Sequence, residues 1–282
     1  MNIRDIKTKA KSILMNRNNI IFVFIFISVI TTAINYIGQT LGVMIPFVSL
    51  FISIIMLPFS HGNIVTALKA VNERGDEITI ENDGLAGLKR FKELFFTYFI
   101  QTVFLMVIIM IICLVLLLIA KIVINESIFD YIGMLFTQAS IYTGDITAYI
   151  EDPVFVEMAV SLGGFIILGF VIIMAVAVVY SLTFVLTPYV LEKYQIYGAK
   201  AMSESARLMK GYKGTLFVLY LSYLGWFLLM ILITALIQVF LPIPLISDLL
   251  IAAITVYLFS AEMQTSVAVL FEEIDLEDKN LI

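Results

Sequence analysis

The stretch Gly198–Met230, GAKAMSESARLMKGYKGTLFVLYLSYLGWFLLM, decides the fold of this chain. In its first half, apolar residues recur at spacings of three and four, which predicts an amphipathic helix suited to a membrane surface. From Thr215 onward no residue is charged until Asp248, so the second half predicts a helix that crosses the membrane. The apolar face of the first half consists of Ala199, Met202, Ala206 and Met209.

The composition of the whole chain is that of a membrane protein. Hydrophobic residues make up 61% of the 282 residues, whereas a soluble domain has about 45–50%. The excess lies in blocks of about 20 residues, the length that crosses a hydrocarbon core of about 30 Å. The alternation of a membrane β-barrel is absent, so the blocks are predicted to be helices that satisfy their own backbone hydrogen bonds. The predicted fold class is therefore all-α integral membrane protein.

Six transmembrane helices are predicted within a single polytopic domain that covers residues 1–282. Pro58 falls inside the second of them and predicts a kink. A long outer loop at 124–158 contains acidic residues and only one cationic neighbour, Lys121, just before it. An acidic tail follows the last span at 271–282. The predicted spans are 20–37, 43–67, 97–123, 159–187, 215–240 and 249–270.

Positive charges predict the orientation of these spans. Lysine and arginine cluster before the first span, between the second and third, and between the fourth and fifth. Because such residues are retained on the cytoplasmic side, both termini are predicted to be cytoplasmic. All three basic segments agree on this orientation.

The pattern of Gly198–Met230 occurs twice more, at residues 2–19 and 84–95. The chain is thus predicted to contain three cytoplasmic-side amphipathic interfacial helices, each followed by a transmembrane hairpin. An alternative is that any short cytoplasmic loop tends to be basic and amphipathic. The basic residues are expected to contact anionic lipid headgroups, at about 1 kcal/mol each. The lysines expected to do so are Lys7, Lys11, Lys89, Lys92, Lys210 and Lys213.

One block of the chain resembles a known family. Residues 203–213, SESARLMKGYK, followed by 221–226, LSYLGW, are similar to the most recognisable block of a bacterial multi-pass membrane family, domain of unknown function 975. The segments IKTKAK at 6–11, PFSHG at 58–62 and LFEEI at 270–274 look similar to its other motifs. The resemblance implies a multi-pass fold in a bacterial cytoplasmic membrane and assigns no catalytic residue. The long loop and Glu262 depart from the family pattern.

Glu262 is a candidate intramembrane polar site, because it lies within the sixth predicted span. A carboxylate there costs about 2.5–3.5 kcal/mol on insertion scales, so it should face a cavity or a polar partner. Gln264, Gln101 and Gln238 are the candidate partners. The site would be linked to a proton or cation; alternatively, Glu262 is a protonated or hydrogen-bonded packing residue.

His61 and Asn63 form a candidate interface site where the second span nears the cytoplasm. His61 could sense pH or contact a headgroup, or it could have no special role. It is the only histidine and Cys113 the only cysteine, so these residue types alone cannot build a metal site. No cofactor, metal, catalytic residue or nucleic-acid partner is expected, because no nucleotide-binding loop or catalytic motif is present.

Two functions of different classes remain open. The first is a non-enzymatic plasma-membrane protein that binds a lipid, a hydrophobic peptide or a partner membrane protein, which includes a second copy of the chain. The second is a small-solute or ion transporter or channel in which Glu262 is the intramembrane polar site. A lipid-modifying enzyme is a weaker third, because it would need several acids, histidines or nucleophiles at one interface.

Overall fold

The structure is a computed structural model that describes residues 2–15, 17–42, 45, 48–72, 75–123 and 153–280. The predicted outer loop lies outside the described residues from position 124 to 152. Within the described ranges every regular element is a helix, and six stretches are long and apolar enough to cross a membrane, which confirms that part of the prediction. These stretches are Asn18–Gly42, Phe51–Val71, Phe91–Ala120, Gly163–Tyr194, Lys213–Phe240 and Pro244–Lys279.

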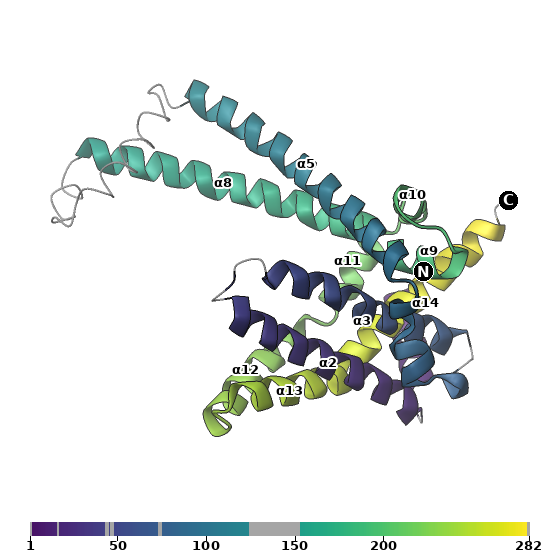
Figure 1. The fold of residues 1–282 in the computed structure, drawn as a ribbon. Helices are drawn as coiled ribbons and strands as arrows, with labels where there is room; N and C mark the ends of the chain where they lie inside the picture. Colours follow the sequence, from purple (N-terminus) through teal and green to yellow (C-terminus); the bar gives the residue numbers. More distant parts are fainter. Residues whose placement is uncertain are drawn as a thin grey trace. The chain divides into compact units, whose positions relative to one another are not determined.

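Two compact units make up the chain (Figure 1). Unit 1 comprises Met1–Gln101 and Leu182–Ile282, and unit 2 comprises Thr102–Ser181. Helices α5 (Phe91–Val123) and α8 (Pro153–Phe184) each have a part in both units. The other elements belong to unit 1: α1 (Ile3–Leu14), α2 (Asn18–Gly42), α3 (Val48–Val71), η1 (Gly75–Glu77), η2 (Ile80–Gly84), α4 (Ala86–Lys89), α9 (Thr187–Tyr194), α10 (Ala199–Leu208), α11 (Lys213–Leu221), α12 (Leu224–Phe240), α13 (Pro244–Thr255), η3 (Val256–Ser260) and α14 (Ala261–Asn280).

The core of unit 1 forms where α2 packs against α3 and α13, and where α14 packs against α1 and α3 (Figure 1). Its largest fully buried side chains include Phe24 of α2, Phe259 of η3 and Phe271 of α14. Helices in a membrane gain little hydrophobic driving force from contact with one another, so close packing of this kind carries their association.

The apolar face of α1 contacts protein. Ile6 and Ala10 are fully buried and Leu14 nearly so, and their spacing of four puts them on one side of the helix. This side packs against α14 and α3, and Lys9 forms an ion pair of 3.6 Å with Glu273. The sequence predicts lipid beneath this helix, whereas the structure covers its apolar side with the chain itself.

The buried face of α10 matches the predicted one only in part, because Met202 and Met209 are buried as predicted. Ala199 is exposed, whereas Ala201 and Ser205 are fully buried. Ser205 tolerates burial because its hydroxyl donates a hydrogen bond of 3.1 Å to the Thr183 carbonyl oxygen. The helix starts at Gly198, whose φ of 66° is easily adopted by glycine and whose amide donates to the hydroxyl of Thr97. This contact ties the start of α10 to α5.

The segment predicted as the second interfacial helix, 84–95, is not one helix. It consists of the end of η2, the short α4 and the start of α5. Gly62 and Gly87 allow this segment to pack closely against α3. A Cβ added to Gly62 would lie 2.1 Å from the carbonyl oxygen of Gly84, and a Cβ added to Gly87 would lie 2.1 Å from that of Pro58. The backbone of this segment is therefore in direct contact with the backbone of α3.

The last two spans contain interruptions that hydropathy does not reveal. The fifth span is divided into α11 and α12 by a turn at Ser222 and Tyr223. The sixth runs as α13, the π turn η3 and α14, and it continues to Asn280. Phe271 and Asp275 are buried, so the segment predicted as an acidic tail is a packed helix as far as it is described.

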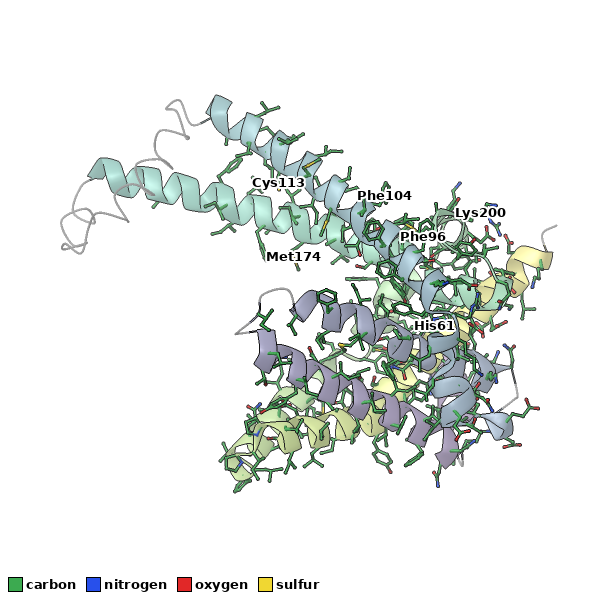
Figure 2. The ribbon with its side chains drawn as sticks, viewed as in Figure 1. His61, Phe96, Phe104, Cys113, Met174 and Lys200 are labelled. Atoms are coloured by element: carbon green, nitrogen blue, oxygen red, sulfur yellow. The ribbon has the colours of Figure 1, made fainter. Side chains whose placement is uncertain are left out.

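Unit 2 is a hairpin of α5 and α8, which carry Cys113 and Met174, respectively (Figure 2). Phe104 and Tyr180 place their ring centroids 6.1 Å apart between the two helices. Most other large side chains are exposed, including Met106 at 64% and Phe170 at 63%. Apolar exposure of this extent suits a surface in contact with hydrocarbon.

Candidate functional site

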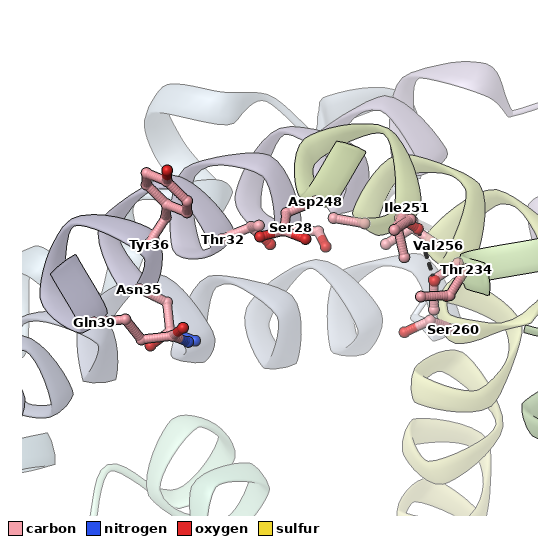
Figure 3. Close-up of a pocket in the computed structure, with 12 residues that line it drawn as sticks. Ser28, Thr32, Asn35, Tyr36, Gln39, Thr234, Asp248, Ile251, Val256 and Ser260 are labelled. Atoms are coloured by element: carbon pink, nitrogen blue, oxygen red, sulfur yellow. Dashed lines mark hydrogen bonds between the residues drawn. The ribbon is translucent and has the colours of Figure 1, made fainter. Parts of the chain in front are cut away.

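A polar stripe runs along the second half of α2. Ser28, Thr32, Asn35 and Gln39 recur at spacings of four, three and four, so they share one side of the helix. Together with Tyr36, they line one wall of a cavity of about 410 Å³ (Figure 3). Polar side chains inside a span are costly unless they face a cavity or a partner, and here the helix directs them to one side.

The opposite wall of this cavity, which we call the polar groove, comes from the end of the chain. Asp248 and Thr255 of α13 face it, with Thr234 of α12 and Ser260 of η3. The Thr255 hydroxyl donates to the carbonyl oxygen of Ile251 at 2.7 Å, which leaves its lone pairs for a second donor. Figure 3 draws the α2 side chains across from those of α13. Further lining residues are Ile251, Ala252 and Val256.

The π turn η3 brings Ser260 to the groove. In an uninterrupted α-helix, Ser260 would lie roughly 120° around the axis from Asp248, at 3.6 residues per turn. A π turn closes its hydrogen bond over five residues instead of four, so the helix beyond Val256 is rotated back. Ser260 consequently lines the same cavity as Asp248. Single π turns of this kind are frequent at functional sites.

The lining of the groove defines which ligands it can hold. Apart from three apolar residues it presents hydroxyl and amide groups and the carboxylate of Asp248. Such oxygen-rich surroundings suit a small cation or an uncharged polar solute, and they do not suit a hydrophobic peptide. Sequence reasoning missed the groove, because average hydropathy hides a polar stripe within an apolar helix. The spacing of Ser28, Thr32, Asn35 and Gln39 was the signal that could have found it.

Glu262 does not line the groove; it contacts the break in the fifth span. The Tyr223 hydroxyl donates to Glu262 Oε1 at 3.0 Å and lies 3.0 Å from Ser266 Oγ. Lys7 Nζ lies 3.9 Å from the centroid of the Tyr223 ring and donates to Ser222 Oγ at 3.2 Å. Tyr223 is fully buried, so Glu262 has a protein partner that fixes its side chain.

Two of the three candidate glutamines have other surroundings in the described part of the chain. Gln264 donates to the hydroxyl of Ser260 at 3.3 Å. Gln238 is exposed on α12, and Gln101 lies on α5. The partner that the structure gives Glu262 is Tyr223 of the fifth span, whose hydroxyl also contacts Ser266 in the same helix as Glu262.

His61 is a buried member of an ion-pair cluster. It lies on α3 (labelled in Figure 2), and its Nε2 is 3.1 Å from Glu192 Oε2 of α9. Arg90 donates to the same oxygen at 3.0 Å and to Glu93 at 2.7 Å. Asn63, the other predicted interface residue, has its side-chain oxygen buried without a hydrogen-bond partner among the described residues.

A second cavity, which we call the charged cavity, lies beside this cluster. It has a volume of about 640 Å³ between α3, α9 and α14. Lys193 contacts Glu272 and pairs with Asp275 at 2.7 Å, and Asn72 donates to Glu272 at 3.2 Å. The cavity is lined by Val65, Leu68, Lys69, Asn72, Glu192, Lys193 and Glu272.

The helices α10 and α14 are also joined by charged groups. Arg207 donates to Glu204 at 2.7 Å and to Asp278 at 2.7 Å, and these hydrogen bonds raise the pKa of Arg207 above its ordinary value. Tyr212 donates a hydrogen bond to Glu277, which raises the pKa of Tyr212. The first contact holds the end of α14 to α10, and the second holds it to the turn before α11.

The lysines predicted to contact lipid headgroups differ in their surroundings. Lys11, Lys89, Lys92 and Lys210 are exposed, and Lys213 is partly so. Lys7 instead contacts Ser222 and Tyr223 as described above. Among the described residues, no group of three or more histidine, cysteine, aspartate or glutamate residues is arranged to hold a metal ion.

Comparison with known proteins supports the resemblance seen in the sequence. The family model described as "Protein of unknown function (DUF975)" matches residues 1–275, which is nearly the whole chain. No curated protein and no solved structure matches the chain.

Proposed function

The chain belongs to the DUF975 family of proteins of unknown function, and on that premise we propose that it moves a small cation or polar solute through the polar groove. In this proposal it is a non-enzymatic, multi-pass protein of the bacterial cytoplasmic membrane. The observation that carries the proposal is the grouping of Asp248 with hydroxyl and amide side chains around one cavity within the apolar helices α2, α12 and α13. Transport proteins place polar groups and irregular helix turns at such positions.

The proposed orientation puts both termini in the cytoplasm. The ion pair between Lys9 and Glu273, and the packing of α1 on α14, support a common side for both ends. The basic segments favour the cytoplasm for that side. In this orientation, Asn35 and Asp248 lie in the outer half of their helices, so the groove would be loaded from outside.

The test is transport in liposomes that contain the purified protein. Protons, Na⁺, K⁺, glycerol and urea are the probes, and empty liposomes give the background. We expect at least one probe to cross faster than background, and Asp248→Asn to reduce that rate by about tenfold if Asp248 is the charged contact. The exposed Asp76 offers a matched control, because Asp76→Asn removes a carboxylate outside the groove. Rates equal to background for all five probes would reject the proposal.

A second candidate function is binding of a lipid, a hydrophobic peptide or a partner membrane protein. It is supported by the exposed apolar side chains of α5 and α8. In the most apolar 18-residue window of each of these two spans, only 6% and 11% of the residues, respectively, are buried inside the protein. Anionic headgroups would contact the exposed lysines Lys11, Lys89, Lys92 and Lys210. Native mass spectrometry from lipid nanodiscs tests it, with Glu262→Gln as the comparison. A bare chain that retains no lipid, peptide or second subunit would reject this function.

A further inference from the structure

The charged cavity has an unusual balance of charge for a surface hollow. It presents the ammonium groups of Lys69 and Lys193 and the carboxylates of Glu192 and Glu272, so the net charge of its lining is zero. Val65 and Leu68 add an apolar patch. Its volume of about 640 Å³ falls within the range of small-molecule sites, about 300–1,000 Å³.

Both kinds of charge retain capacity for a ligand. Among the described residues, the contacts of Glu192 with His61 and Arg90 use Oε2. The side chain is 25% exposed, so Oε1 is open to an incoming donor. Within the described part of the chain, Lys69 forms one ion pair, with the buried Asp83 at 2.5 Å, and its side chain is 33% exposed. An ammonium group can donate three hydrogen bonds, so Lys69 retains donors for a ligand. The cavity therefore offers a free acceptor and free donors together.

The internal ion pairs hold these groups in place. Asp83 accepts a second hydrogen bond from the backbone amide of Thr79 at 2.9 Å, which fixes the partner of Lys69. Glu192 is held between His61 and Arg90, and Lys193 between Glu272 and Asp275. Groups that are already ordered lose little conformational entropy when a ligand binds.

We propose that the charged cavity binds a zwitterion that carries a phosphate and an ammonium group. The phosphate contacts Lys69, Lys193 and the amide of the exposed Asn72. The ammonium contacts Glu192 Oε1, and the carbon linker lies on Val65 and Leu68. A simple anion would be repelled by the two carboxylates and a simple cation by the two lysines, so the lining selects a ligand with both charges.

Such a ligand has two sources, a phosphoethanolamine lipid headgroup or a free phosphorylated amine, and the experiment separates them. The full-length protein is placed in nanodiscs of phosphatidylglycerol, with or without phosphatidylethanolamine, and retained lipid is measured by native mass spectrometry. In the lipid without ethanolamine, binding of free phosphoethanolamine is measured by calorimetry, with inorganic phosphate and ethanolamine as the separate charges. Retained phosphatidylethanolamine identifies the headgroup, and binding of phosphoethanolamine identifies the free ligand.

The variants are chosen so that the fold survives. Lys193→Gln combined with Glu272→Gln removes one charge of each sign, and the buried Asp275, which loses Lys193, keeps its ion pair with Lys279 at 2.8 Å. Asn72→Leu changes an exposed side chain. We expect the double variant to bind at least about tenfold more weakly, and Asp248→Asn in the polar groove to bind as the wild type does. The proposal is overturned if neither zwitterion binds, if phosphate alone binds equally well, or if the double variant binds unchanged.

Discussion

The Tyr223 hydroxyl donates a hydrogen bond of 3.0 Å to Glu262, while Lys7 lies 3.9 Å from the centroid of the same ring. One buried side chain thus joins the first helix of the chain, the break in the fifth span and the sixth span. The contact with Glu262 therefore lies at the break itself, because Tyr223 is one of the two turn residues between α11 and α12.

Replacement of Tyr223 by phenylalanine should destabilise the fold. The variant keeps the ring beneath Lys7 but removes the hydrogen-bond partner of Glu262 and of the fully buried Ser266. We expect a loss of about 1–3 kcal/mol, the cost of leaving buried polar groups unpaired. Thermal unfolding in detergent measures it, and Tyr197→Phe serves as the control, because Tyr197 is 53% exposed. Equal stability of the two variants would contradict the assigned contact.

Replacement of Gly62 by alanine should prevent the close approach of α3 and η2. The new Cβ would lie 2.1 Å from the carbonyl oxygen of Gly84, and a backbone atom cannot move aside as a side-chain tip can. We expect a loss of about 3 kcal/mol or more, seen as a lower yield of folded protein in size-exclusion chromatography. Gly225→Ala is the matched control: nothing lies within 4 Å of its added Cβ, so its stability should stay within about 1 kcal/mol of the wild type.

The proposed orientation predicts which positions a membrane-impermeant maleimide reaches in intact cells. In a Cys113→Ser background, a cysteine in place of Ile243, between α12 and α13, should react from outside. Cysteines in place of Ser12 and Lys210, both exposed, should react only after the cells are permeabilised. The reverse pattern would place both termini outside.

The contact between Tyr212 and Glu277 predicts a small effect of alkaline pH. The hydrogen bond raises the pKa of Tyr212 above its unfolded value of 10.0, so the neutral phenol is the form that the fold favours. This stabilisation is complete below the unfolded pKa and is lost as the pH rises through the folded one. Tyr212 is only partly buried, so solvent screens its contact with Glu277 and we expect less than about 1 kcal/mol. Wild type and Tyr212→Phe should therefore differ in unfolding temperature at pH 8 and converge in strong alkali; a constant difference would refute the assignment.

The six spans follow from the sequence because each depends on a local property, a long apolar run. The polar groove could not be predicted in the same way, because its two walls are far apart in the chain: Asn35 is on α2 and Asp248 on α13. The partner of Glu262 was missed for a related reason. Tyr223 looks like one of many aromatic residues in an apolar span until the break before α12 directs it inward.

The predicted interfacial helices show what the spacing of apolar residues cannot predict. Spacing predicts that a helix has an apolar face, but it does not say whether lipid or protein covers that face. For α1 the answer depends on α14, and the start of α10 at Gly198 is joined to Thr97 of α5. Both contacts join segments that no local pattern connects.

The packing of α1 against α14 also has a consequence for how the protein is synthesised. The ribosome produces α1 well before α14, the helix against which Ile6 and Ala10 pack. During translation, the apolar side of α1 must therefore be held by something else, either the lipid surface or a chaperone, until Glu273 and its neighbours emerge. The membrane-surface role predicted from the sequence would then describe the nascent chain, and the packed helix would describe the finished one.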